Sequence, residues 1–357
     1  MNERLGRVRK IMVDKGLDGL IVTGRANTYY LSGFTGSTSY FLIGLSKAWL
    51  VVDFRYTIQA GKEVYEGIKA LEQTDGFYAV LDQLILDENI RSVGFEGNNL
   101  SFSEYGKLST KLTYASKLVS LGGEVDLLRI KKEGQEIEAL AQAVSMGDKV
   151  FDHILNIARP GIRESELGAE IDYQMKKLGA KGPSFDTIVA AGERSAMCHA
   201  APSENIIKKG DSIVLDFGVI YHHYCSDMTR TIFMGDPGEE MKKIYGIVKD
   251  AQQAALDSFF SGMPGRDADG IARSVIAKAG YGNCFGHGLG HGVGIEIHED
   301  PRLSQKSEDT LEDGMVFTAE PGIYVEGLGG VRIEDMVTLS NGKLRNFTTS
   351  AKGMIIL

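Results

Sequence analysis

The chain has 357 residues, of which 43% are hydrophobic and 24% are charged, and its formal net charge at pH 7 is −9. This length exceeds one typical core and predicts two domains. The acidic balance argues against a nucleic-acid partner, because phosphate groups bind basic surface, and no apolar run approaches the length that spans a membrane.

The N-terminus and the cysteines both point to the cytoplasm. The first ten residues are charged, follow a helical period and lack the apolar core of a signal peptide. Three cysteines (Cys198, Cys225 and Cys284) cannot all pair and show no CxxC spacing, so we expect reduced thiols. A thiol nucleophile at Cys198 beside His199 is disfavoured, since adjacent residues on a strand point to opposite faces.

Residues 1–126 alternate helix and strand signals and predict a small α/β domain. An amphipathic helix opens the chain, and strands are expected at 17–22 and 48–52. After Gly122 and Gly123, the charged segment 129–133 opens a long helix, which ends at Pro160-Gly161 because proline cannot continue the hydrogen-bond ladder. We therefore expect domains at 1–126 and 127–357.

The second domain contains an internal repeat. Each copy reads as a long helix, a Pro-Gly break, a second helix ending at Gly179 or Gly280, and strands that carry a carboxylate. A chance alignment of glycines is the alternative. The paired positions share one offset of 104 residues: Pro160 and Pro264, Gly210 and Gly314, Asp216 and Glu320, and Gly218 and Gly322 (264−160, 314−210, 320−216, 322−218).

Four carboxylates interrupt strand-like apolar stretches in this domain. Burying one such group alone costs several kcal/mol, because the charged form loses its water. A pair of divalent cations would balance four carboxylates and leave a neutral histidine to complete the site. The sequence therefore predicts a two-metal enzyme whose candidate ligands, in chain order, are Asp216, Asp227, His291, Glu320 and Glu334.

The aspartates and the glutamates each bracket a hairpin. If the first hairpin turns at Tyr221 and His222, Asp216 and Asp227 face one another across adjacent strands. The turn lacks an Asn-Gly or Asp-Gly signal, so a shifted register stays open.

The second hairpin, between Glu320 and Glu334, turns on three nearby glycines. Strand alternation puts Arg332 on the face of Glu334, where it would orient a metal-bound carboxylate. A surface arginine on an edge strand is the alternative.

The histidines are read from their surroundings. His287 and His291 have helical spacing, but five glycines in the surrounding segment 286–294 forbid a stable helix, and neither HExxH nor GxGxxG fits. A crowded extended strand is expected, with His291 as ligand and His287 in packing or support. His199 and His298 each precede a proline-limited turn and could also be structural. We assign no role to His222 and His223.

Five segments carry a family resemblance: LDFG, CSDMTRT, GHGVGIEIHE, TAEPGIY and VRIED. Together with NTYYLSGFTGS and VVDFRY near the N-terminus, they resemble the pita-bread metallopeptidases, in the branch of prolidase and aminopeptidase P. The resemblance implies an α+β fold, in which a C-terminal pita-bread domain of two pseudo-symmetric halves follows a smaller α/β domain. Creatinase shares this layout without the metal, and retention of all five ligands speaks against that branch.

The resemblance also implies how the ligands divide. Asp216 would chelate one metal, His291 and Glu320 the other, and Asp227 and Glu334 would bridge both. An oxygen-rich site with one imidazole suits manganese or cobalt better than zinc.

Further roles follow from the resemblance. Glu320 would act as general base, while His298 and His199 would hydrogen-bond the developing oxyanion and the proline side of the bond. Arg302 would grip the free carboxylate of a dipeptide, and Phe185 would line the same pocket or simply pack in the core.

These assignments favour an Xaa-Pro dipeptidase (prolidase). Aminopeptidase P acting on longer peptides is the alternative, and a non-catalytic binding module on the same fold is a remote one. The expected partner is a proline-containing dipeptide or short peptide, and the resemblance implies a homodimer.

Overall fold

The computed structural model describes residues 3–357, which form two compact units divided between Arg129 and Ile130. None of the described helices combines the length and apolarity needed to cross a membrane. The pattern of glycines and charges placed the division between residues 126 and 127, at the start of the short 3-10 helix η2 (Asp126–Arg129).

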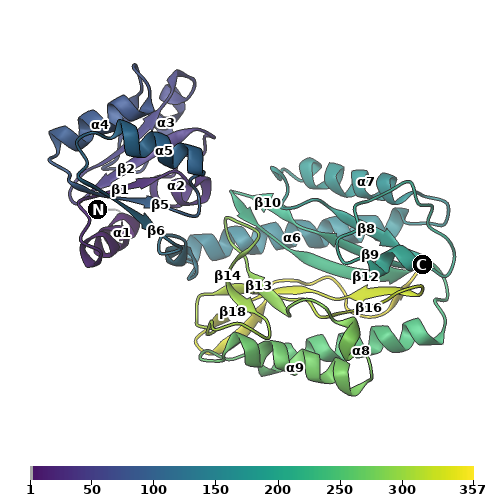
Figure 1. The fold of residues 1–357 in the computed structure, drawn as a ribbon. Helices are drawn as coiled ribbons and strands as arrows, with labels where there is room; N and C mark the ends of the chain where they lie inside the picture. The colour runs from purple at the N-terminus through teal and green to yellow at the C-terminus, as the bar shows by residue number, and fades with distance from the viewer. Residues whose placement is uncertain (1–2) are drawn as a thin grey trace. The chain divides into compact units, whose positions relative to one another are not determined.

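The N-terminal unit is a mixed six-stranded sheet with helices packed on it (Figure 1). Its strand order is β4-β3-β2-β1-β5-β6, and the expected strands at 17–22 and 48–52 appear as β1 and β3. The elements are α1 (Glu3–Asp14), β1 (Gly19–Val22), α2 (Arg25–Ser32), β2 (Ser39–Gly44), β3 (Ala48–Val52), η1 (Phe54–Tyr56), α3 (Thr57–Glu63), β4 (Lys69–Glu72), α4 (Phe77–Asp87), β5 (Ser92–Glu96), α5 (Phe102–Lys111) and β6 (Lys117–Leu121).

The C-terminal unit consists of two similar halves. The first half comprises α6 (Gly134–Ile157), α7 (Glu164–Lys177), β7 (Gly182–Pro183), β8 (Ile188–Ala191), η3 (Gly192–Ala196), β9 (Ser212–Phe217), β10 (Val219–Tyr221), β11 (Tyr224–Cys225) and β12 (Met228–Phe233). The second comprises α8 (Glu239–Ser258), α9 (Gly265–Lys278), η4 (Gly282–Cys284), β13 (Gly290–Gly292), β14 (Glu299–Leu303), β15 (Val316–Ala319), β16 (Gly322–Val325), β17 (Gly329–Arg332), β18 (Asp335–Ser340) and β19 (Lys343–Asn346), followed by β20 (Ile355–Ile356).

The two halves place their helices on the outside and their strands between them. In Figure 1, α6 and α7 run along one side of the strands, and α8 and α9 run along the other. Each helix pair buries an apolar face against the strands of its own half: Phe151 and Ile171 pack with Leu215 in the first, and Val248 and Ala272 pack with Phe317 in the second. The predicted pita-bread architecture is confirmed.

The repeat is real, but its offset is not uniform. The helices correspond at an offset of 101 residues, since α6 and α8 end at Ile157 and Ser258 (258−157) and α7 and α9 span 164–177 and 265–278. The strands correspond at 104, as Gly210 and Gly314 show with their left-handed φ of 93° and 87°. The predicted match of Pro160-Gly161 with Pro264-Gly265 is therefore wrong by three residues (104−101).

The first hairpin turns one residue later than expected. Tyr221 of β10 pairs with Tyr224 of β11, so the turn consists of His222 and His223. Both have positive φ, 45° and 69°, as a two-residue type I′ turn requires. Histidine tolerates this conformation better than most residues do, but it gives a weak sequence signal.

This shift changes the partner of Asp216. Strands β9 and β12 pair Asp216 with Thr229, and Asp227 lies two residues away, on the same face but diagonal to Asp216. The direct opposition of the two aspartates is a wrong prediction. The diagonal arrangement gives Thr229 a place between the acidic groups, and the site uses it.

Candidate metal centre

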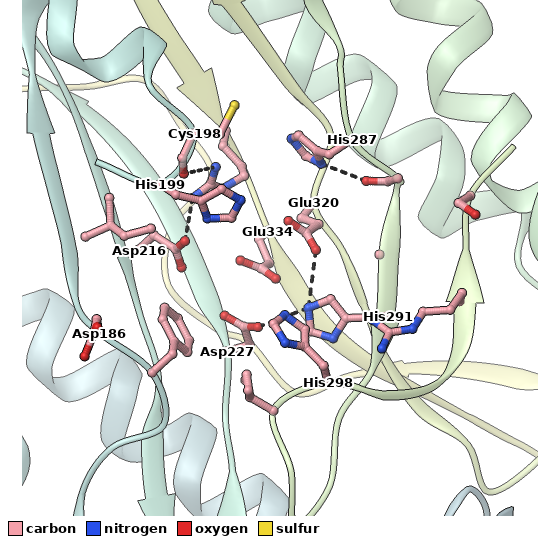
Figure 2. A pocket seen from close by; sticks show the side chains of 18 of the residues that line it. Asp186, Cys198, His199, Asp216, Asp227, His287, His291, His298, Glu320 and Glu334 are labelled. Carbon is pink, nitrogen blue, oxygen red and sulfur yellow. Dashed lines mark hydrogen bonds and ion pairs between the residues drawn. The ribbon is translucent and has the colours of Figure 1, made fainter. Parts of the chain in front are cut away.

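The candidate ligands converge on one cavity of about 570 Å³ inside the C-terminal unit (Figure 2). Both halves of the repeat contribute to its walls. Every residue proposed from the sequence as ligand, catalytic group, substrate contact or support lines it: Phe185, His199, Asp216, Asp227, His287, His291, His298, Arg302, Glu320, Arg332 and Glu334.

Three of the five ligands already have their donor atoms together. Donor atoms of Asp227, His291 and Glu334 lie within 4.8 Å of one another, and all three residues are buried. Glu320 joins them, because its Oε1 lies 3.5 Å from Nε2 of His291. Oδ2 of Asp227 lies at the same distance, 3.5 Å, from that nitrogen.

The geometry of His291 leaves a lone pair directed at these carboxylates. Its Nδ1 lies 3.0 Å from the carbonyl oxygen of Gly292, which only accepts hydrogen bonds, so Nδ1 carries the proton. Burial lowers the pKa of His291 to about 3, so the ring is neutral near pH 7. Nε2 then faces Asp227 and Glu320 as an unprotonated nitrogen, the state that binds metal ions.

Crowding of the backbone holds His291 in place, as the glycines predict. A Cβ atom on Gly290 would lie 2.1 Å from the carbonyl oxygen of Thr318, and one on Gly292 would lie 2.1 Å from that of Asp300. Strand β13 therefore fits here only with glycine at positions 290 and 292, on either side of His291.

Three carboxylates, those of Asp227, Glu320 and Glu334, have raised pKa values in this surrounding. Burial, followed by the charge of Asp216, raises the pKa of Asp227 well above its ordinary value. Burial and the charge of Asp227 do the same for Glu334. The pKa of Glu320 rises to about 7, chiefly through burial. A cluster that holds protons this strongly binds positive charge well.

Two oxygen atoms of the cluster have nothing to bond. Oδ1 of Asp216 and Oε1 of Glu334 are buried without a hydrogen-bond partner among residues 3–357. Buried acceptors left in this state cost free energy, and a bound cation would remove that cost. The donor set of four carboxylates and one neutral imidazole therefore fits divalent metal ions, the cofactor class of the resemblance.

Arg332 is a buried arginine beside the acidic groups. Its Nη2 donates to Oδ2 of Asp216 at 2.5 Å, and its Nε donates to the hydroxyl of Thr229 at 3.0 Å. That hydroxyl in turn donates to Oε2 of Glu334 at 2.6 Å. Arg332 thus orients one carboxylate directly and a second through Thr229, and the alternative of an exposed edge arginine is wrong.

His287 continues the network on the far side of Arg332. Nη1 of Arg332 donates to the hydroxyl of Tyr324 at 2.7 Å, and that hydroxyl lies 2.9 Å from Nε2 of His287. Nδ1 of His287 donates to the carbonyl oxygen of Gly288, so Nε2 accepts from Tyr324. Burial lowers the pKa of His287 to about 4, which keeps this direction fixed.

His199 and His298 approach the acidic groups from different elements (Figure 2). The ring of His298 packs edge-on against His291, with centroids 4.5 Å apart. Partial burial and the charge of Arg302 lower the pKa of His298. His199 lies in the irregular segment that follows η3, so the strand alternation invoked to separate it from Cys198 does not apply, and both residues line the cavity.

Sequence reasoning missed several residues of the site. Asp186 and Ile297 line the cavity, while Tyr324 and Thr229 build its hydrogen-bond network. Thr229 lies in the segment CSDMTRT, two residues after Asp227, so strand alternation could have identified it. Asp186 follows Phe185 in a segment without a periodic signal.

Comparisons with known proteins show which families the chain resembles. The sequence pattern of Metallopeptidase family M24 matches residues 138–341, and that of the Creatinase/Prolidase N-terminal domain matches residues 4–131. The chain is 37% identical over 356 residues to the Xaa-Pro dipeptidase of Pyrococcus furiosus, covering 99% of this chain and 100% of that protein.

Two solved structures are similar over nearly the whole chain. An Xaa-Pro dipeptidase from Bacillus anthracis is 39% identical with a TM-score of 0.97 and covers 99% of each chain. An X-Pro aminopeptidase from Thermotoga maritima is 37% identical with a TM-score of 0.90 and covers 96% of this chain and 98% of that one.

Proposed function

The chain belongs to metallopeptidase family M24, and from that premise we propose that it uses two divalent metal ions to hydrolyse the Xaa-Pro bond of dipeptides. The observation that carries the proposal is the convergence of Asp227, His291 and Glu334, whose donor atoms lie within 4.8 Å of one another. Buried unpartnered oxygens on Asp216 and Glu334 support the same site.

The proposed function divides the five ligands between two ions. Asp216 would hold one ion, His291 and Glu320 would hold the other, and Asp227 and Glu334 would be ligands of both. Carboxylate-rich donor sets favour manganese, then cobalt, over zinc. When bound, the ions supply Lewis acidity and a nucleophile near neutral pH.

Glu320 is the proposed general base. Its pKa of about 7 in the metal-free cluster shows how strongly this position attracts a proton. It takes a proton from the attacking water and returns one to the proline nitrogen as that nitrogen leaves.

His298 and His199 are the proposed donors to the substrate. His298 is neutral near pH 7 because its pKa is lowered, and one ring N–H remains to donate to the developing oxyanion. His199 donates on the proline side of the scissile bond.

Arg302 and Phe185 are the proposed substrate contacts. The side chain of Arg302 on β14 is about half exposed and lies 3.8 Å from Asp300 in a loose ion pair, so its guanidinium is free to receive a substrate carboxylate. Phe185 offers an apolar surface for the proline ring. A bond before proline lacks an N–H, so recognition depends on such ring contacts.

Xaa-Pro aminopeptidase activity on longer peptides is the second candidate. Its support is the similarity to the X-Pro aminopeptidase of Thermotoga maritima, which is close to that to the prolidases. A non-catalytic binding module would not need all five ligands.

The deciding experiment measures metal dependence and peptide length together. Metal-free protein should be inactive, and manganese should restore cleavage of an Xaa-Pro dipeptide. The Arg302→Ala variant should lower kcat/KM for the dipeptide by roughly 10- to 100-fold, as loss of a bidentate charged contact does, mainly through KM. Arg266→Ala, an exposed arginine of α9, is the control.

The outcomes separate the candidates. Preference for an Xaa-Pro-Yaa tripeptide over the dipeptide would move the assignment to aminopeptidase P. Full cleavage without metal would overturn the mechanism. We also propose a cytoplasmic homodimer, and sedimentation should then give twice the chain mass of 38.9 kDa.

A further inference from the structure

The segment 192–202, between β8 and β9, forms the wall of the cavity that carries Cys198 and His199. In the part of the chain that the structure describes, it pairs with no strand after η3. Something else must therefore hold His199 at a fixed position relative to the metal ligands.

Glu164, the first residue of α7, binds backbone and side-chain groups at the two ends of this segment. Its carboxylate is fully buried and accepts from the backbone N–H of Ala191 at 2.9 Å, just before the segment. It also accepts from the hydroxyl of Ser203 at 2.7 Å and from the amide of Asn205 at 2.9 Å, just after it. One side chain thus joins the two ends of the loop.

Arg194 carries this hold into the loop itself. Its Nε donates to Glu164 at 3.0 Å, and its Nη2 donates to the carbonyl oxygen of Ala201 at 2.8 Å. Burial alone would raise the pKa of Glu164, but the hydrogen bonds from Ser203, Asn205 and Ala191 and the charge of Arg194 outweigh it and lower the pKa. The carboxylate of Glu164 is therefore ionised near neutral pH. We call the pair of Glu164 and Arg194 the clamp.

The metal side of the loop has a second anchor. Nη1 of Arg332 donates at 3.2 Å to the carbonyl oxygen of Cys198, the residue before His199. The hydroxyl of Ser195 accepts at 2.7 Å from the N–H of Gly330 in β17. The loop is held between these contacts and the clamp, so we expect His199 to move when the clamp is released.

We propose that Glu164, acting through Arg194, is a positioning residue that sets His199 against the metal ligands. This inference rests on the proposed function, in which His199 contacts the substrate. Neither Glu164 nor Arg194 lines the cavity, so neither touches substrate.

The second half of the repeat contains a similar device, built from different positions. Asp269 of α9 is fully buried and pairs with Arg273, whose Nε lies 2.7 Å from its Oδ2. Nη2 of Arg273 donates to the carbonyl oxygen of His287 at 2.7 Å, and the N–H of Leu289 donates to Asp269 at 3.0 Å. Here too a helix carboxylate and an arginine hold a segment that carries a histidine.

The two clamps do not occupy equivalent positions. At the helix offset of 101, Glu164 corresponds to Gly265 (265−164), where a Cβ atom would lie 2.3 Å from the carbonyl oxygen of Arg302. The second half therefore places its carboxylate one turn further along, at Asp269. That two halves reach the same arrangement from different positions favours a role beyond the fold, and it provides an internal control.

The test is a double-mutant cycle on kcat/KM for an Xaa-Pro dipeptide with manganese. Arg194→Ala should fold, because Glu164 keeps its bonds to Ala191, Ser203 and Asn205. It should lose roughly 10- to 100-fold, as displaced catalytic groups do. In a His199→Ala background the same change should cost less than about 2-fold. In a His298→Ala background it should keep its full cost.

The outcomes are decisive in both directions. Equal losses from Arg194→Ala in all three backgrounds would mean a general structural effect and would overturn the proposal. Glu164→Gln should follow the same pattern with a larger loss, and Glu164→Asp should recover part of it, since a shortened carboxylate keeps the charge.

A hydrogen-exchange measurement tests the clamp without using activity. In Arg194→Ala, the amides of 192–202 should exchange faster while those of 285–290 stay unchanged, and Arg273→Ala should give the reverse. If wild-type protein cleaves no Xaa-Pro bond, the proposed function fails, and this measurement alone decides whether the clamp holds the loop. Unchanged exchange at 192–202 would overturn it.

Discussion

Glu334 and Asp335 are neighbours in the chain, and their surroundings could hardly differ more. Glu334 faces Asp227, Glu320 and Asp216, and burial among those charges raises its pKa well above the ordinary value. Asp335 is equally buried, but the charges of nearby basic side chains outweigh its burial and lower its pKa.

The difference lies in the partners of the two side chains, Glu334 just before β18 and Asp335 at its first position. Asp335 pairs with Nη2 of Arg230 at 2.8 Å and with Nζ of Lys352 at 2.7 Å, and it accepts from the amide of Asn346 at 2.7 Å. Within the described residues, the carboxylate of Glu334 accepts a hydrogen bond only from the hydroxyl of Thr229, and its other oxygen has no hydrogen-bond partner. Basic side chains of the protein neutralise the carboxylate of Asp335, whereas the carboxylate of Glu334 depends on a bound cation for neutralisation.

The largest expected effect comes from removing a carboxylate of the metal centre. Glu320→Gln should lower kcat by roughly 10²- to 10⁴-fold, the range for loss of a general base. Stability of the metal-free protein should be kept, because an uncompensated buried charge disappears. Steady-state kinetics and urea unfolding measure the two effects, and retained turnover would remove Glu320 from its proposed role.

Removing the carboxylate of Asp335 should have the reverse effect, a loss of stability. Asp335→Ala should destabilise the protein by about 3–5 kcal/mol, because Arg230 and Lys352 are left with uncompensated charge. Glu334→Gln, measured in the same metal-free buffer, is the matched control and should cost little or even stabilise. Equal losses for the two neighbours would break the comparison.

The pH dependence of metal-free protein sharpens the contrast. Glu320 has a pKa of about 7 in the folded cluster against an ordinary value of 4.5, so the folded state keeps a proton that the unfolded state releases between these values. Rising pH across this window therefore favours unfolding. With about 1.4 kcal/mol per pKa unit, the loss should be on the order of 1–3 kcal/mol.

Urea unfolding with a chelator at about pH 5 and about pH 7.5 measures this loss. Manganese should abolish or reverse it, because metal binding requires deprotonated ligands, and Glu320→Gln should flatten it without metal. Asp335 and Glu164, whose pKa values are lowered, behave oppositely, since their stabilisation is lost only as the pH falls below their ordinary values of 3.8 and 4.5. Equal stability at both pH values would contradict the contrast.

Much of this site follows from the sequence, because each ligand interrupts an apolar strand that has no other use for a charge. The helices, the glycine-bordered strand of His291 and the two halves are all readable from periodicity and turn residues. The register of the first hairpin was harder to predict. The His222-His223 turn has positive φ without asparagine or glycine, and moving its centre by one residue replaced Asp227 with Thr229 opposite Asp216.

Long-range partners were out of reach for a different reason. Glu164 reads as an ordinary acidic residue at a helix start, where carboxylates are common. Its contacts with Ser203 and Asn205 depend on a loop that has no periodic pattern. Asp335 is similar, since Lys352 and Asn346 come from segments whose pairing only the folded sheet determines.

The smallest expected effect concerns Lys352, the more exposed of the two basic residues that pair with Asp335. Its Nζ also donates to Gln252 at 2.9 Å, and its side chain is 22% exposed, so water replaces part of what a substitution removes. Lys352→Met should cost roughly 1–2 kcal/mol, as for one hydrogen bond to a charged group, because Arg230 still neutralises Asp335. Activity should be unchanged, and Lys343→Met, an exposed lysine of β19, is the control. A loss as large as that of Asp335→Ala would mean that Lys352, rather than Arg230, supplies the main compensating charge, and the acid limb of the unfolding curve would then shift upward with it.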